Sequence, residues 1–196
     1  MIERLLAVYD IDLHWAPYFL DPSMPLEGRT RTPQTTADTP KSDLERRGEE
    51  AGIEFRRGRT FSPHTHLALE AAEFAQEHGS VQQVLDYHRA LFKAYFTDFE
   101  NLMDIDVLVK HADAAGLDGA AMRRALTDRI YFEAVDQGIE HSYAIGVTGI
   151  PTFILNDQYA IVGAQEYETF VRVLERLGVP RRADAPPESA QGATEP

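Results

Sequence analysis

Hydrophobic and polar residues alternate with two different periods along the chain, which predicts a mixture of helices and strands. In residues 1–9 the apolar side chains recur at helical spacing, which predicts the end of a helix. In residues 10–16 apolar and polar side chains alternate one by one, which is typical of a half-buried strand. Residues 21–40 are rich in proline, threonine and aspartate and predict a loop that is long for a compact domain.

A short charged helix is predicted at 41–52, and residues 62–146 have helical periodicity throughout. The first long helix is predicted to begin at Ser62 and Pro63 and to end at Gly79. Further helices are predicted to begin at Ser80, Asp104 and Asp118, and a last one to cover 129–145. The helix after Ser80 has one apolar face, made of Val84, Leu85, His88, Leu91, Phe92 and Tyr95.

Two short β-rich runs at 152–163, separated by a polar turn, predict a hairpin followed by a helix up to residue 178. An isolated hairpin is only marginally stable, so we expect it to share one sheet with the strand at 10–16. The predicted parts are 1–61 and 147–178, which form one domain, and a helical insertion at 62–146. Residues 179–196 have almost no large apolar side chains and predict a disordered tail.

Composition and charge exclude several classes of function. The chain has 196 residues and a net charge of −13, which argues against a nucleic-acid partner or an anionic membrane surface. No apolar run reaches the length of a membrane span, and the first residues lack the pattern of a signal peptide, so we expect a cytoplasmic protein. The sequence contains no cysteine, which excludes disulfides, thiolate metal sites and a cysteine nucleophile within it.

The stretch GVTGIPTFI at 146–154 is the most informative candidate site. It places Gly149, Ile150 and Pro151 directly before a predicted buried strand, where a proline has no N–H for the ladder. Proline is also the residue that admits a cis peptide bond, so a cis bond between Ile150 and Pro151 explains the motif. A trans proline that enters an edge strand explains it as well.

Other polar residues have structural explanations that we prefer. His64 and His66 are separated by one residue and face different ways on a helix, so we expect no metal site there. His88 is expected to be a hydrogen-bonded core residue and Trp15 a core residue. The basic run 55–59 is expected to be a solvated linker, although it could attract an acidic ligand such as the carboxylates of glutathione. The acidic residues are read as helix caps and surface because no calcium-loop glycine accompanies them: Asp98, Glu100, Asp104 and Asp106.

The order of elements and the motif at 146–154 resemble the DsbA-like thioredoxin-fold family, and within it the FrnE-like disulfide oxidoreductases. Glutathione transferases of the kappa class and 2-hydroxychromene-2-carboxylate isomerases are similar relatives. The resemblance covers about residues 4–178 and implies an α/β thioredoxin-like fold with an all-helical insertion. It also implies that Pro151 is the cis-proline of that fold and that Gly149, Ile150 and Pro151 bind the substrate. Its most specific segments are GVTGIPTFI with IVGAQ, and LFKAYFTDFENLMD.

The chain departs from this family at its beginning, where it lacks the first strand, the start of the first helix and the Cys-x-x-Cys motif. We therefore expect a natural reading frame that begins upstream, and a chain that is redox-incompetent as written, with no catalytic residue, metal or cofactor of its own. The resemblance implies a thiol- or disulfide-bearing protein, or glutathione, as partner. A glutathione-dependent isomerase or transferase and a non-catalytic binding module are the alternatives. A homodimer is a further expectation, since another chain could fill a gap in the sheet.

Overall fold

The structure is a computed structural model that describes residues 1–33 and 35–186. The chain forms two compact units, which are described separately. The first consists of residues 1–14 and the chain from 143 onward, and the second of residues 15–142. The second unit therefore begins well before residue 62, where the sequence placed the start of a helical insertion.

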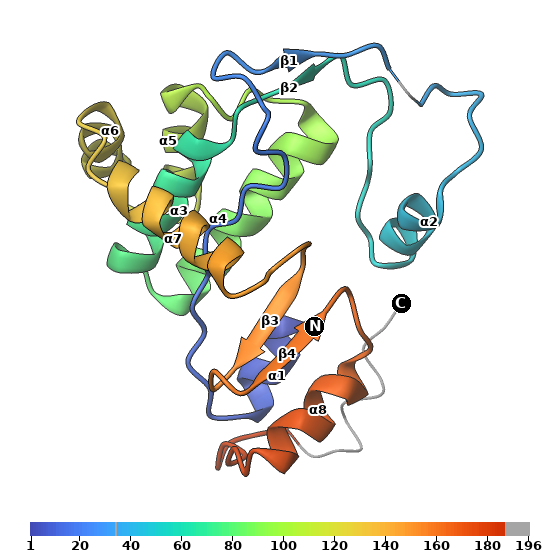
Figure 1. The fold of residues 1–196 in the computed structure, drawn as a ribbon, viewed down its shortest axis with the longest axis vertical. Coiled ribbons are helices and arrows are strands. Elements are labelled where there is room, and N and C mark those ends of the chain that lie inside the picture. Colours follow the sequence, from blue (N-terminus) through green and yellow to red (C-terminus); the bar gives the residue numbers. More distant parts are fainter. Residues whose placement is uncertain (34, 187–196) are drawn as a thin grey trace. The chain divides into compact units, whose positions relative to one another are not determined.

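The first unit packs two helices with one β-hairpin (Figure 1). Its elements are α1 (Ile2–Val8), β3 (Thr152–Leu155), β4 (Tyr159–Val162) and α8 (Tyr167–Arg176). Strands β3 and β4 pair antiparallel around a turn at 156–158, as the sequence predicts. The core joins residues from both ends of the chain: Leu5, Val8, Tyr9, Ile161, Phe170 and Leu174.

The segment after α8 hydrogen-bonds to the end of α1. The N–H of Asp10 donates to the Pro180 carbonyl at 3.0 Å, and the N–H of Arg182 donates to the Val8 carbonyl at 2.9 Å. Tyr9 also pairs with Arg181 as an isolated antiparallel bridge. Residues 180–182 thus have defined partners where the sequence predicted disorder, and residues 187–196 of the predicted tail lie outside the described residues.

The predicted strand at 10–16 is wrong, and so is the single sheet that it was expected to share with the hairpin. Residues 10–16 form no strand, and the described residues contain two separate two-stranded sheets. A strand is stabilised by ladder hydrogen bonds, and here the backbone groups take other partners. Asp10 bonds to Pro180, and the N–H of Trp15 donates to the side-chain carbonyl of Gln76 at 2.6 Å. Alternating polarity alone therefore does not make this segment a strand.

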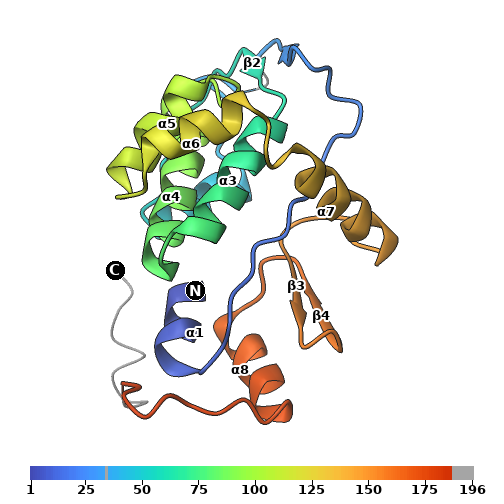
Figure 2. The same cartoon turned by 90° about the vertical axis from the view of Figure 1, so that its left-hand side faces the viewer.

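The second unit is mostly helical, and Figure 2 shows α3 to α6 packed beside one another. Its small sheet pairs β1 (Arg29–Thr30) with β2 (Phe61–Ser62), and α2 covers Asp43–Glu50. Its core is built from residues of α3 to α6 and includes Phe74, Tyr87, Leu91, Leu108 and Met122. The larger helical elements are α3 (His66–His78), α4 (Val81–Lys93), the π-helical segment η1 (Ala94–Asp98), α5 (Ile105–Ala114), α6 (Gly119–Thr127) and α7 (Phe132–Ala144).

Local capping explains most of these boundaries. Ser80 forms a capping box with Gln83, and Asp104 and Asp118 accept hydrogen bonds at the starts of α5 and α6, as the sequence predicts. The predicted start of α3 is wrong, because Ser62 is buried in β2 and the helix begins after Thr65. The expected apolar face of α4 is also wrong in part, because the side chain of Phe92 is 55% exposed.

Candidate functional site

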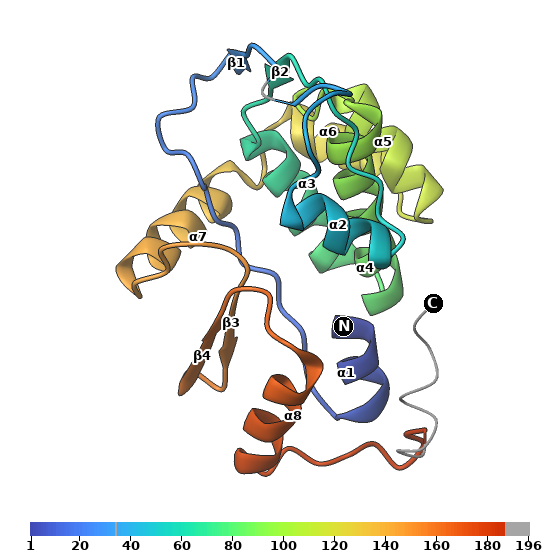
Figure 3. The ribbon, with the colours of Figure 1, turned by 90° about the vertical axis from the view of Figure 1, so that its right-hand side faces the viewer.

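The candidate site is the connection from α7 to β3 (Figure 3). Gly146 ends the helical path with a φ of 85°, a left-handed conformation that glycine adopts at low cost, and its N–H donates to the Tyr143 carbonyl at 3.0 Å. The chain then passes through Gly149, Ile150 and Pro151 before β3 begins at Thr152. The loop is therefore held between a helix end and a paired strand.

Two hydrogen bonds fix the loop on the first unit. The hydroxyl of Thr152 donates to the Gly149 carbonyl at 2.7 Å, and the N–H of Gly163, just after β4, donates to the Pro151 carbonyl at 2.8 Å. The peptide bond between Ile150 and Pro151 is cis, which is the isomer that the family resemblance implies. The loop thus has a defined conformation on both sides of Ile150.

Ile150 faces outward at the centre of this loop. Its side chain is 56% exposed, and within the described ranges its N–H and C=O have no hydrogen-bond partner. A Cβ built on Gly149 would meet nothing within 4 Å, so open space adjoins the backbone there. The loop therefore presents one free main-chain donor and one free acceptor next to an apolar side chain.

Chemically, the loop can bind and orient but cannot react. Gly149, Ile150 and Pro151 carry no titratable or nucleophilic side chain, and the sequence has no cysteine. A free main-chain donor and a free main-chain acceptor are the groups that pair with the main chain of a peptide. The candidate site can therefore offer two hydrogen bonds to a main chain.

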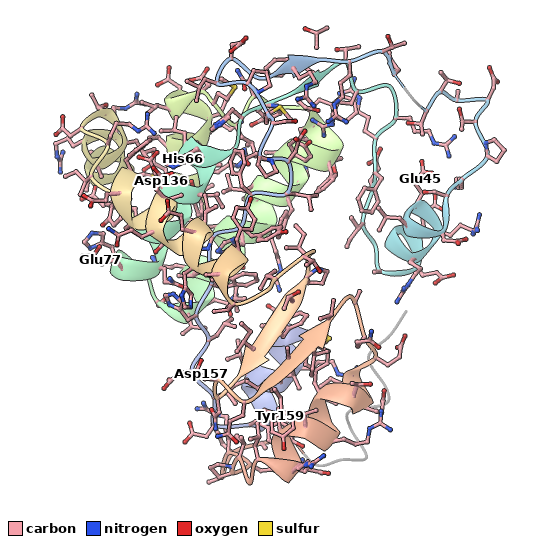
Figure 4. All side chains as sticks on the ribbon, in the orientation of Figure 1. Glu45, His66, Glu77, Asp136, Asp157 and Tyr159 are labelled. Atoms are coloured by element: carbon pink, nitrogen blue, oxygen red, sulfur yellow. The ribbon has the colours of Figure 1, made fainter. Side chains whose placement is uncertain are left out.

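The second unit contains a buried ionic network that the sequence did not indicate. Glu70 is completely buried, and Arg129 binds its carboxylate through Nε at 3.0 Å and Nη2 at 2.6 Å. His66 lies 2.8 Å from Glu70 and 3.2 Å from Asp136, and Figure 4 shows His66 beside Asp136. Glu70 and Arg129 are 59 positions apart in sequence, so no local pattern reveals the pair.

The charges of this network shift two neighbouring pKa values. Burial alone raises the pKa of Glu70, but hydrogen bonds from His66 and Arg129 outweigh it and hold the pKa below its usual range. Burial lowers the pKa of His64, and the nearby His66 and Arg129 lower it further. Among the residues that the structure describes, no group of His, Cys, Asp or Glu side chains is arranged to hold a metal ion.

His88 is not the hydrogen-bonded residue that the sequence suggested. Its ring stacks on Trp15 with centroids 4.3 Å apart, but its Nε2 and the Nε1 of Trp15 are buried without a partner. Burial lowers the pKa of His88 to about 4, so the ring is neutral at pH 7. A largely apolar environment favours the neutral form of the His88 ring over the charged form.

Most residues of the acidic cluster and of the basic run form helix caps or ion pairs. Asp104 is a cap, and Glu100 binds Lys110 at 2.7 Å and His111 at 2.8 Å. In the basic run, Arg57 binds Glu45 at 2.6 Å, and this hydrogen bond lowers the pKa of Glu45 to about 2. The other acidic residues pair at the surface, Asp98 with Lys93 at 2.6 Å and Asp106 with Arg123 at 2.6 Å.

Arg56 and Arg59, also in the basic run, lie over aromatic rings instead of carboxylates. The expectation of a solvated linker is therefore wrong for Arg57 and Arg59, which are in contact with other side chains. Within the described ranges, no helix combines the length and the apolar character that crossing a membrane requires.

Comparisons with known proteins find relatives both by sequence and by structure. The chain is 31% identical over 175 residues to an uncharacterized protein, YwbO, of Bacillus subtilis, and the match covers 88% of this chain and 85% of that protein. It also resembles the crystal structure of a probable DsbA oxidoreductase from Streptomyces coelicolor, with a TM-score of 0.60 and 25% identity. That match covers 79% of this chain, which spans only 60% of the solved chain.

The family model for the DSBA-like thioredoxin domain matches residues 1–175, which is nearly the whole described chain. The thioredoxin-like α/β class that the sequence indicated is therefore confirmed. With the helical unit and the Gly149–Pro151 loop already described, the chain belongs to the DSBA-like thioredoxin domain family.

Proposed function

We propose that this chain is the substrate-binding part of a FrnE-like thiol–disulfide oxidoreductase, and that it binds a disulfide-bearing peptide at Ile150. The observation that carries the proposal is the free N–H and C=O of this exposed residue, in a loop fixed on both sides. Family membership supports the substrate class, because one solved structure that the chain resembles is a probable DsbA oxidoreductase.

Main-chain recognition suits a substrate whose side chains vary. An extended peptide can pair with the donor and acceptor of Ile150 in the manner of an added strand, whatever its sequence. The apolar side chain of Ile150 adds contact area next to these two hydrogen bonds. The site therefore selects an extended conformation and leaves the choice of sequence open.

The reaction itself needs a sulfur that the chain does not contain. In thiol–disulfide exchange a thiolate attacks one sulfur of a disulfide, a new S–S bond forms, and the other sulfur leaves as a thiolate. With no cysteine in the sequence, the attacking thiolate has to come from another molecule or from a segment outside this sequence. The part of this chain is to hold the disulfide in place.

The test is a calorimetric titration of the chain with a short disulfide-linked peptide. The variant I150A removes exposed apolar contact and is expected to weaken binding about threefold to tenfold. The matched control is I154A, because Ile154 is also exposed, at 45%, but lies on β3 away from the loop. Its affinity should equal that of the unmodified chain.

Two results would count against the proposal. One is a peptide affinity that I150A and I154A change to the same extent, which would place binding elsewhere. The other is no detectable binding at millimolar peptide. An insulin-reduction assay accompanies the titration, and the chain alone is expected to show no turnover because it has no thiol.

A further inference from the structure

Three arginines of the second unit, Arg31, Arg56 and Arg59, form what we call the arginine cluster. The N–H of Arg31 donates to the Thr60 carbonyl at 2.7 Å, which extends the β1–β2 pairing and places Arg31 across from the segment that contains Arg59. The N–H of Arg56 donates to the Phe96 carbonyl at 3.0 Å, which ties that segment to η1. Backbone hydrogen bonds therefore connect the segment that contains Arg56 and Arg59 to Arg31 on one side and to η1 on the other.

Aromatic rings hold two of these guanidinium groups. The guanidinium carbon of Arg59 lies 3.8 Å from the ring centroid of Tyr95 and 4.4 Å from that of Phe99. Arg56 lies 4.9 Å from the same Phe99 ring. Such cation–π contacts occupy the faces of a guanidinium and leave its N–H edge for hydrogen bonds in the plane.

The ring of Phe99 is held in place by an unusual backbone. Phe99 has a φ of 59°, a left-handed conformation that is rare and unfavourable for a bulky residue. Conformations of this kind persist where the surrounding structure enforces them, and they gather at ligand sites. Here the conformation puts one ring under two arginines.

Among the described residues, no carboxylate neutralises the positive charge of the arginine cluster. Throughout 1–33 and 35–186, none of the three guanidinium groups forms an ion pair, although the sequence has 32 acidic and 19 basic residues. One nitrogen of Arg59, Nη2, is buried without a hydrogen-bond partner. Burial lowers the pKa of this guanidinium; Tyr95 raises it and the charge of Arg31 lowers it further. In the same basic run, Arg57 has Glu45 as its partner.

We propose that the arginine cluster is a binding site for a small dianion that carries carboxylate or phosphate oxygens. Guanidinium groups bind such oxygens in pairs of parallel hydrogen bonds, and their fixed planes make the geometry specific. A partly desolvated cation with no counter-ion is unfavourable, and a bound anion removes that cost. The site belongs to the second unit and does not depend on the function proposed for the Ile150 loop.

The experiment titrates the chain with inorganic phosphate and, separately, with malonate, and follows each titration by calorimetry at constant ionic strength. The two probes distinguish a phosphate ligand from a dicarboxylate, and millimolar binding of either supports the site. R59Q removes the most enclosed cation and is expected to weaken binding at least tenfold. R56Q alters an exposed side chain that should not affect folding, and is expected to weaken binding about threefold.

The control variant is R123Q, which removes one positive charge from the same unit at a surface pair with Asp106. Its affinity for either probe should equal that of the unmodified chain. The proposal is overturned if neither probe binds, if R123Q weakens binding as much as R59Q, or if both cluster variants bind normally. If R59Q does not fold, the affinities of R56Q and R123Q are compared instead. Equal affinities for both probes would then overturn the proposal.

Discussion

The two units of this chain differ in how far apart in sequence their stabilising partners lie. In the helical unit most backbone groups bond within a few residues, and caps such as Ser80 and Asp104 lie next to the helices that they begin. In the first unit the core joins Leu5 to Phe170, and Tyr9 pairs with Arg181. Local patterns therefore predict the helical unit well and leave the arrangement of the first unit largely open.

The buried Glu70–Arg129 pair is one of the long-range contacts in the helical unit, with partners 59 positions apart in sequence. The variant E70Q is expected to lower the free energy of unfolding by about 3 kcal/mol, since it leaves Arg129 without its counter-ion. Arg129 is 46% exposed, and water moderates the loss. Urea unfolding measures the effect.

The control for this pair is E77Q on the same helix, α3, where an exposed carboxylate accepts from the Tyr131 hydroxyl at 2.6 Å. Its effect should stay below about 1 kcal/mol. If E70Q and E77Q destabilise the chain equally, the long-range pair is no more important than the local surface, and the contrast between the units weakens.

His88 tests whether the stability of the helical unit also depends on a buried side chain in the middle of a helix. Its pKa falls from 6.5 to about 4 on folding, so the unfolded chain binds the proton more readily. The contribution of His88 to stability is complete above about pH 6.5 and is lost as the pH falls toward 4. At pH 5 the loss relative to pH 7.5 should be about 2 kcal/mol.

The variant H88F keeps a ring against Trp15 but does not titrate. Urea unfolding of both proteins at pH 7.5 and pH 5 should show the unmodified chain losing about 2 kcal/mol more than H88F on acidification. Equal losses would mean that His88 is protonated in the folded chain, contrary to its buried and unpartnered Nε2.

The cap at Ser80 gives the smallest expected effect, and its partner Gln83 lies only three residues away in sequence. S80A removes the oxygen that accepts from the Gln83 N–H and should cost about 1 kcal/mol. S80D retains an acceptor at the same place and should restore most of the stability. A chemical unfolding series on the three proteins measures both, and an S80D protein as unstable as S80A would contradict the capping role.

The sequence could predict those elements whose signals are local. The hairpin at 152–162 and the starts of α4, α5 and α6 are where the patterns placed them. The strand at 10–16 could not be excluded from its own residues, because a strand depends on a partner and the partner of Asp10 is Pro180. Ser62 was misassigned for the same reason, since its pairing with Arg29 lies outside any local window.

The site divides in the same way. Gly149, Ile150 and Pro151 carry a short motif, so the loop could be located from the sequence alone. The arginine cluster could not be located from the sequence, because Arg31 and Arg56 come from separate segments. The left-handed backbone conformation of Phe99 is not predicted by any residue pattern either. Sequence reasoning finds sites made of one segment and misses sites that folding assembles from several.

The most direct test of main-chain recognition at Ile150 is an amide NMR titration of the chain with a disulfide-linked peptide. The Ile150 amide should shift strongly and become protected from exchange at saturation, because its free N–H gains a partner. The Ile154 amide on β3 should change little. A saturated complex in which the Ile150 amide neither shifts nor gains protection would contradict main-chain recognition at this loop.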